Sequence, residues 1–448
     1  MTEINDQISV FNLSSGALDR VGRDGRPRSP YDFAARYGPR FGFAWEPFFL
    51  RRTVVRGGYG VFQSAVDRYN EPLTFPWGMA SNVTISTVDN VTPPFTLSQG
   101  PPPSILKVAE GVTGPEFGAS ASNIQRKPAG DYVQNWQFSV QHELLPQKLL
   151  VDVAYAGSKG THLLAYPALN QVALNQMGPG NAQARRPYPT YQAVDTAANL
   201  GSSIYHSLQA KAESRFWAGL NFLVSYTYAR EIDDYSGPRS DVFNSGTAQF
   251  IQNVYNLRAE RSVGGFNFPQ RLVASYNYAL PFGTGKRLLN GGGWSGRLLG
   301  GWQVSGIATM QKGGPVAISV TPNSCNCFNG GLRPNRIGDG RLQDQQRSLG
   351  RFFDTAAFAA PTTYTFGNSE RNLMLAPGLV NFDFSLSKKT NFSGADTGRY
   401  AELRAEFFNA CNTPQFASPN AVVGTPQFGM INGARAARVI QFALKVHF

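Results

Sequence analysis

The strongest constraint on the fold is an alternation of apolar and polar residues that recurs in segments of about ten. It is clearest at the end of the chain, where every second residue is apolar: Ile440, Phe442, Leu444, Val446 and Phe448. Successive side chains of a β-strand point to opposite faces, so this segment predicts a strand with one apolar and one polar face. Such a strand fits the edge of a β-sandwich or the wall of a transmembrane β-barrel, and the final aromatic favours the barrel.

Roughly eleven segments share this pattern. They are residues 40–45, 55–61, 136–141, 149–155, 208–215, 220–228, 271–280, 302–310, 380–387, 401–407 and 438–448. Each has about the length that crosses a bilayer at the tilt of a barrel strand. An open sheet in lipid would leave edge N–H and C=O groups unpaired, and bacterial single-chain barrels have even strand numbers. Either a twelfth strand lies at 7–13, or the N-terminal part of a larger barrel is missing.

The links between these segments alternate in length. Short or medium links are expected at 46–52, 144–148, 216–219, 281–300 and 393–398. Long links are expected at 63–132, 157–204, 231–269, 320–378 and 410–437. Outer-membrane barrels have short periplasmic turns and long extracellular loops. With the C-terminus in the periplasm, every long link falls outside and every short one inside. The fold class predicted is therefore all-β: an antiparallel transmembrane β-barrel, present in part.

Composition agrees with this interpretation. Only 16% of residues are charged, below the usual quarter or so of a soluble protein, and 12% are aromatic. A mean hydropathy of −0.26 and the lack of a run of about 18 apolar residues argue against a helical membrane protein. The net charge of +12 is not gathered in a basic stripe, so we expect no nucleic-acid partner.

No catalytic or cofactor chemistry is evident. The four histidines are dispersed, and no phosphate loop, dinucleotide motif or paired metal-ligand spacing occurs. We therefore expect neither an enzyme nor a metal or cofactor site. Cys325, Cys327 and Cys411 are too few for a disulfide framework. A local disulfide in an exposed loop is one interpretation, and inert loop thiols are the preferred one.

Charged residues on the polar side of the alternation are the candidate functional residues. They are Arg56, Lys211, Glu213, Asp383, Glu402, Arg404 and Glu406, with Asp152 and Arg271 on the same side. In a barrel these side chains would face the lumen. Mixed signs on neighbouring strands suit cross-strand ion pairs and contact with a plug. A substrate path through the lumen is the functional alternative.

Several strand-and-turn stretches carry a family resemblance. They are residues 37–47, 53–62, 135–142, 153–162, 222–230, 301–306, 333–335 and 404–409. Together they resemble the C-terminal half of the barrel of TonB-dependent outer-membrane transporters, in particular the Oar-like group. The resemblance implies a barrel of 22 strands, of which about 11–12 are present here. The C-terminus also resembles the signal read by the barrel-assembly machinery. The residues that match this signal are Gln441, Ala443, Val446 and Phe448.

The resemblance implies a location in the outer membrane of a Gram-negative type bacterium. It also implies outer-membrane lipid, the assembly machinery, the TonB complex and a bulky ligand as partners. A signal peptide, coupling box, plug and N-terminal regulatory-like domain are not visible within 1–448. We therefore expect the whole chain to be the C-terminal portion of a receptor barrel, a fragment not competent alone. A complete passive porin or adhesin barrel and a secreted carbohydrate-binding β-sandwich are the alternatives.

Overall fold

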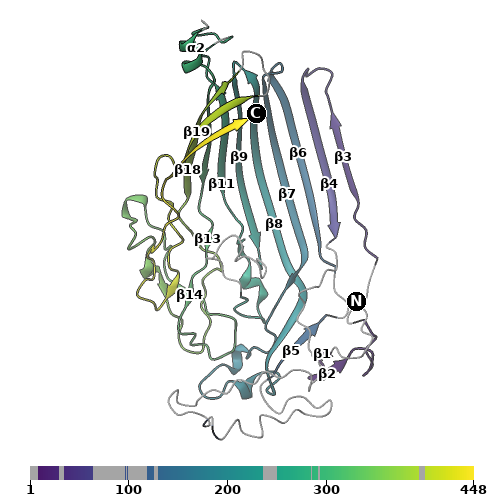
Figure 1. The fold of residues 1–448 in the computed structure, drawn as a ribbon. Helices are drawn as coiled ribbons and strands as arrows, with labels where there is room; N and C mark the ends of the chain where they lie inside the picture. Colours follow the sequence, from purple (N-terminus) through teal and green to yellow (C-terminus); the bar gives the residue numbers. More distant parts are fainter. Residues whose placement is uncertain are drawn as a thin grey trace.

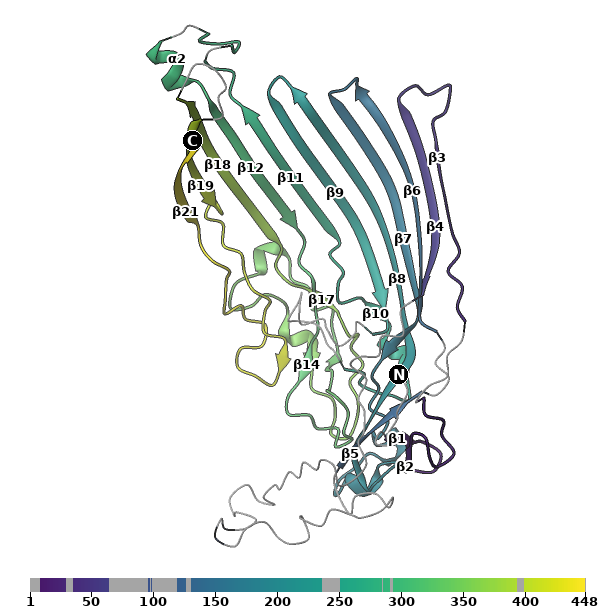
Figure 2. The ribbon, with the colours of Figure 1, turned by 45° about the vertical axis from the view of Figure 1, so that its right-hand side comes forward.

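One curved wall of eleven antiparallel strands dominates the fold (Figures 1 and 2). The computed structural model describes residues 9–29, 35–63, 96, 98, 119–125, 130–235, 250–283, 285–290, 293–392 and 399–447. The wall strands are β3 (Arg40–Trp45), β4 (Thr53–Gln63), β6 (Tyr132–Leu145), β7 (Leu149–Ala165), β8 (Tyr191–Trp217), β9 (Leu220–Asp233), β11 (Gln270–Ala279), β12 (Trp302–Gln311), β18 (Leu379–Asn391), β19 (Tyr400–Phe408) and β21 (Val439–His447). Each predicted strand is present, so the all-β antiparallel prediction is confirmed.

The wall is not closed. Its strands follow chain order from β3 to β21, and within the described part of the chain these two end strands pair with no strand on their outer edges. Of the two alternatives, the one that places a twelfth wall strand at 7–13 is wrong for the residues described there. Ser9–Asn12 form β1, which pairs with β2 (Ala17–Arg20) in a separate two-stranded sheet.

Short links lie at one end of the wall and long ones at the other, as the sequence predicts (Figure 1). The tightest is the two-residue turn between β8 and β9, where Ala218 and Gly219 have φ of 50° and 86°. Positive φ at both positions is typical of the hairpin turns that match strand twist. The link between β11 and β12 contains the short helix α2 (Trp294–Leu299). The 393–398 turn lies outside the described residues.

The link expected at 157–204 is shorter than predicted, because both of its ends belong to strands and only residues 166–190 connect them. β7 continues to Ala165 and β8 begins at Tyr191, because the two strands stay paired through register shifts beyond Gly160. β5 (Ala119–Ile124) runs parallel to this extension of β8. Phe11 of β1 packs there with Tyr191 and Val194 in a small buried cluster. The sheet therefore extends past the wall and supports the N-terminal hairpin.

The remaining loops fold onto one another. Their strands are β10 (Ser262–Val263), β13 (Pro315–Val316), β14 (Ser319–Val320), β15 (Asn335–Arg336), β16 (Phe358–Ala359), β17 (Met374–Leu375) and β20 (Val422–Val423). Their 3-10 turns are η1 (Leu174–Gln176), η2 (Gln183–Arg185), η4 (Leu257–Glu260), η5 (Asp344–Gln346) and η6 (Thr355–Ala357). The β14–β20 pair joins the loop after β12 to the loop before β21. Two buried apolar clusters, around Leu332 and Phe353, lie in these loops.

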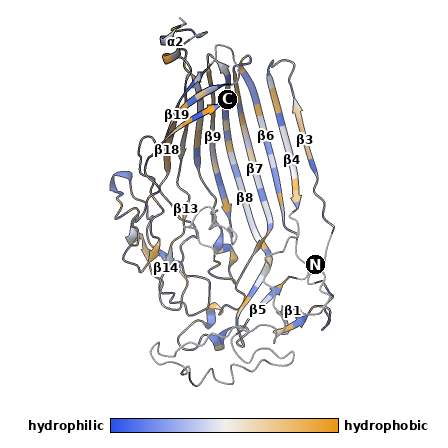
Figure 3. Ribbon diagram, viewed as in Figure 1, coloured by the Kyte–Doolittle hydropathy of each residue, from blue (hydrophilic) through white to orange (hydrophobic). Residues whose placement is uncertain are grey.

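The wall itself has no second protein layer over its apolar face among the described residues. Register places Phe43, Phe138 and Tyr155 in one row across that face. Their exposed fractions are 51%, 50% and 42%, and Phe442 at the other end reaches 73%. Hydropathy changes residue by residue along the strands instead of forming long apolar blocks (Figure 3). A β-sandwich would bury such an apolar face against a second sheet, so this uncovered face does not fit the β-sandwich alternative.

Candidate functional site

The seven predicted charged residues share the polar face of the wall. Residues that face each other in register lie on the same face of a sheet. The register pairs Lys211 with Asp152 and Ser225, Asp383 with Ile307, and Glu406 with Ser385 and Gln441. The charged residues therefore lie on the face opposite the apolar rows. A hollow of about 640 Å³ on this face spans β8, β9, β11, β12, β18 and β19. Because one hollow spans six neighbouring strands, this side of the wall is the concave one. We call it the concave face.

Charges on the concave face pair along single strands, not across strands as expected. On β8, Glu213 lies between Lys211 and Arg215, at 2.9 Å and 2.6 Å. On β19, Arg404 lies between Glu402 and Glu406, at 2.5 Å and 3.5 Å. Residues two apart on a strand point to the same face, which brings each group of three together. The prediction of cross-strand pairs is wrong for these six residues.

Arg56 and Asp383 bind neutral partners. The Arg56 guanidinium donates to the Gln141 side chain at 2.6 Å. The Asp383 carboxylate accepts from the Asn381 side chain and from the backbone N–H of Asn409, both at 2.9 Å. Positive and negative side chains therefore largely cancel on the concave face along the middle of the wall.

Apolar residues also line the concave hollow, and the alternation did not reveal them. Leu223, Ile307 and Phe408 lie on this face and are 38%, 49% and 44% exposed. Leu223 sits between Phe222 and Val224, and as an apolar residue on the polar side it does not fit the alternation that predicts the strand. The hollow consequently presents apolar surface between Glu213 and Asp383.

Two buried ion pairs fasten the long loops to the end of β9. Glu260 receives two bonds from the Arg333 guanidinium, at 2.7 Å and 3.1 Å, and both side chains are at most 2% exposed. Arg371 binds the Asp233 carboxylate and, at 3.3 Å, the backbone carbonyl of Glu260. Both arginines come from the loop between β12 and β18. Residues 333–335 contribute to the family resemblance, but sequence alone gave Arg333 no role.

Glu231 lies near these ion pairs at the end of β9, beyond the segment 220–228 that the sequence predicts to cross the membrane. Burial raises the pKa of Glu231 to about 7, with a smaller contribution from Asp233 and an opposing one from Arg371. The neutral form of a carboxyl group is favoured where the group has few water contacts and a like charge lies nearby. We therefore expect the loop attachment to depend on pH near neutrality.

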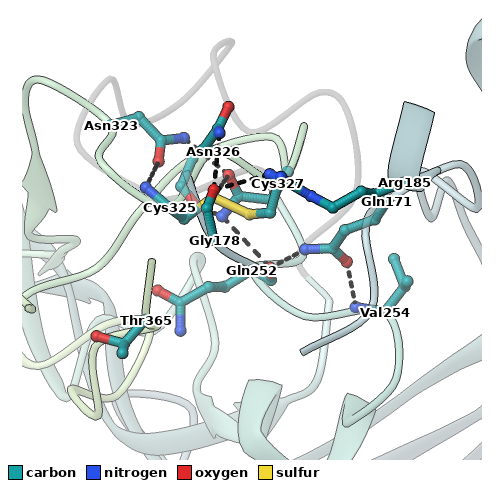
Figure 4. Close-up of a disulfide and its surroundings, with 12 residues drawn as sticks. Gln171, Gly178, Arg185, Gln252, Val254, Asn323, Cys325, Asn326, Cys327 and Thr365 are labelled. Atoms are coloured by element: carbon teal, nitrogen blue, oxygen red, sulfur yellow. Dashed lines mark hydrogen bonds between the residues drawn. A yellow bond between two sulfur atoms is a disulfide. The ribbon is translucent and has the colours of Figure 1, made fainter. Parts of the chain in front are cut away.

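Cys325 and Cys327 form a disulfide, so the alternative of a local disulfide is confirmed and the preferred interpretation of inert loop thiols is wrong for this pair. Both are buried, at 1% exposure, in the loop cluster around Leu332. Figure 4 shows the surrounding contacts, including the Asn326 amide donating to the Gly178 carbonyl at 3.0 Å. The third cysteine, Cys411, is free and exposed. The disulfide belongs to the packing that joins the loops after β7 and β12.

The proposed assembly signal lies on β21. Gln441 and Ala443 are on the concave face, opposite Glu406 and Arg404, while Val446 is on the apolar face opposite Ala401. Phe448 lies outside the described residues. Within the described part of the chain, no group of three or more His, Cys, Asp or Glu side chains could hold a metal ion. No helix in that part is long and apolar enough to cross a membrane.

Comparison with known proteins gives one family match. Residues 1–441 match the family described as "Outer membrane beta barrel domain". A comparison with curated proteins finds no match.

Solved structures are similar only at low identity. The outer membrane transporter YddB from Escherichia coli is 9% identical, with a TM-score of 0.47 over 92% of this chain. The FrpB iron transporter from Neisseria meningitidis is 12% identical, with a TM-score of 0.41 over 92%. The ferripyoverdine receptor of Pseudomonas aeruginosa is 10% identical, with a TM-score of 0.43 over 93%. The chain spans 40%, 38% and 33% of these proteins.

Proposed function

This chain belongs to the outer membrane beta barrel domain family and lies in the outer membrane, and from this premise we propose that it forms part of the wall of a transporter or receptor barrel. One observation carries the proposal: a wall whose apolar face is uncovered and whose opposite face is concave, polar and hollowed. Hydrocarbon suits the first face, and a water-filled or plugged lumen suits the second.

The directions of the two edge strands support a larger barrel. β3 ends at the short link before β4, and β21 ends at the C-terminus on the same side. The two edges therefore run in the same direction and cannot close on each other as an antiparallel pair. An odd number of further strands is needed, and eleven more would give the 22 expected from the resemblance. We propose that residues 1–448 form the C-terminal portion of such a barrel.

The ligand would be bulky and its uptake active. This part of the proposal rests on the resemblance to TonB-dependent transporters of the Oar-like group, in which the inner-membrane proton-motive force drives uptake. Outer-membrane lipid, the barrel-assembly machinery and the TonB complex are the partners it implies. Arg404 and its two carboxylate neighbours would contact a plug or the passing ligand. The protein would carry out no chemical reaction.

Planar-bilayer recording separates this function from a passive porin. The purified chain is added alone and, in parallel, after refolding with a preceding segment of the longer protein. A wall of a plugged transporter conducts no steady ion current in either case. A steady current from residues 1–448 alone would support the passive porin and contradict the transporter.

A further inference from the structure

A second and larger hollow lies where the wall meets the loops. Its volume is about 850 Å³. One side is the concave face near the loop ends of β8, β9, β11 and β12. The other side consists of loop residues 312–314, 376–378, 415–418 and 434–435. We call this hollow the mouth pocket.

The mouth pocket contains three cations: Arg271, Lys312 and Arg435. They come from β11, from the residue after β12, and from the loop before β21. All three are exposed. No Asp or Glu lines the pocket among the described residues, and none of the three side chains has an ion-pair or hydrogen-bond partner there.

This lack of pairing is unusual for the concave face. Deeper in the wall, Lys211 and Arg404 each contact a carboxylate on their own strand. In the loops, Arg333 and Arg371 are buried against carboxylates. Cations gathered in one hollow without a counter-charge repel one another. Because the three side chains are exposed, water weakens this repulsion without removing it. An anion in the pocket would relieve it.

Neutral donors and aromatic rings complete the lining. Arg271 lies in register between Thr227 and Gln311, so its guanidinium is flanked by a hydroxyl and an amide on the same face. The aromatic lining residues are Tyr205, Phe266, Phe268 and Phe416. Phe266 and Phe416 are 40% and 39% exposed. Oxyanions can accept from the guanidinium and its neighbours, while the rings offer an apolar surface.

We propose that the mouth pocket binds a soluble ligand that carries several oxyanion groups on an aromatic or apolar body. The inference rests on the proposed function and specifies the ligand chemistry of that receptor. The pocket lies on the side of the wall opposite the uncovered apolar face, so the ligand enters from the loop side and not from lipid.

Fluorescence anisotropy with pyrenetetrasulfonate, an aromatic polyanion, tests the proposal on the full chain in detergent. Pyrenyltrimethylammonium is the probe of opposite charge. Benzenetricarboxylate and tris(hydroxymethyl)benzene serve as charged and neutral competitors of matched shape. Binding of the polyanion, weakened by salt and displaced only by the tricarboxylate, is the expected result.

Substitutions then locate the binding site. Changing Arg271, Lys312 and Arg435 together to Gln should weaken polyanion binding by about tenfold, or about 1.4 kcal/mol. The matched control changes two arginines and one lysine at the other end of the wall to Gln: Arg51, Arg287 and Lys286. This control should bind like the unmodified protein.

A charge reversal guards against a folding defect. Changing the three mouth cations to Glu should abolish polyanion binding and create binding of pyrenyltrimethylammonium, which a misfolded protein would not do. Equal binding by the Gln triple variant and the control would overturn the proposal. A steady current in the bilayer experiment together with charge-selective binding would contradict the proposed transporter and leave the anion site in place. Failure of the proposed function and failure of the anion site can therefore be told apart.

Discussion

Replacing Val224 with Arg places a charge at the centre of the uncovered apolar face. Val224 lies midway between Leu220 and Tyr228, four residues from each. At roughly 3.4 Å per residue and a tilt of about 40°, it is about 10 Å from either end along the membrane normal. The apolar band of such a barrel is about 25 Å tall, so Val224 lies within a few ångströms of the midplane.

The expected cost of this charge is about 2–4 kcal/mol of barrel stability. It would lower the folding equilibrium constant by a factor of roughly 30 to 800. Urea titration of the chain in lipid vesicles, followed by tryptophan fluorescence, measures the change. The matched variant is Thr309→Arg, on the concave face and within about 10 Å of the same depth, because it follows Ala308 in the register Val224–Ala274–Ala308. It should cost about 0.5 kcal/mol. Equal losses in the two variants would refute the assignment of the faces.

Three further outcomes are expected. Deletion of Phe448 should abolish accumulation in the outer membrane, and an unchanged heat-modifiable band in that fraction would contradict this. Arg333→Met should destabilise the loops by about 3–5 kcal/mol because it leaves Glu260 charged and buried, and adding Glu260→Gln should restore much of the loss in hydrogen-exchange protection. The pKa of Glu231 rises from 4.5 to about 7 in the folded chain because burial disfavours the charged carboxylate. The contribution of the protonated group to the free energy of unfolding, on the order of 3 kcal/mol, is therefore complete below about pH 4.5 and lost as the pH rises through 7. Hydrogen exchange at the loop end of β9, corrected for its intrinsic pH dependence, should show this trend, and Glu231→Gln should remove it.

The wall was predictable because its strands obey a period of two. In β12, Val304, Ala308 and Met310 alternate with Ser305 and Thr309, and the observed register keeps these sets on opposite faces. The alternation continues over several residues in each strand, which makes it recognisable in the sequence. It is required because one face of a barrel strand contacts lipid and the other contacts water. The polar residues Asn221, Ser225 and Thr227 fix the register of β9, but the rule did not identify Leu223 as an apolar residue on the concave face.

The loops were not predictable for a different reason. Their stability depends on contacts between residues far apart in sequence, such as Glu260 with Arg333 and Asp233 with Arg371. No local periodicity reports such pairs. The same holds for the mouth pocket, where Arg271 was expected on the lumen side but Lys312 and Arg435 reach it only because the loops fold back.

The central claim is that one face of the wall meets lipid and the other does not. Nitroxide labels at single cysteines along β9, in a Cys411→Ser background, test it by electron paramagnetic resonance with oxygen and a water-soluble nickel reagent. Labels at Phe222 and Val224 should be accessible to oxygen and protected from nickel. Labels at Leu223 and Ser225 should show the reverse or be shielded from both, although Leu223 is itself apolar. Oxygen accessibility that follows the hydrophobicity of the replaced residue, or that does not alternate along the strand, would contradict the account.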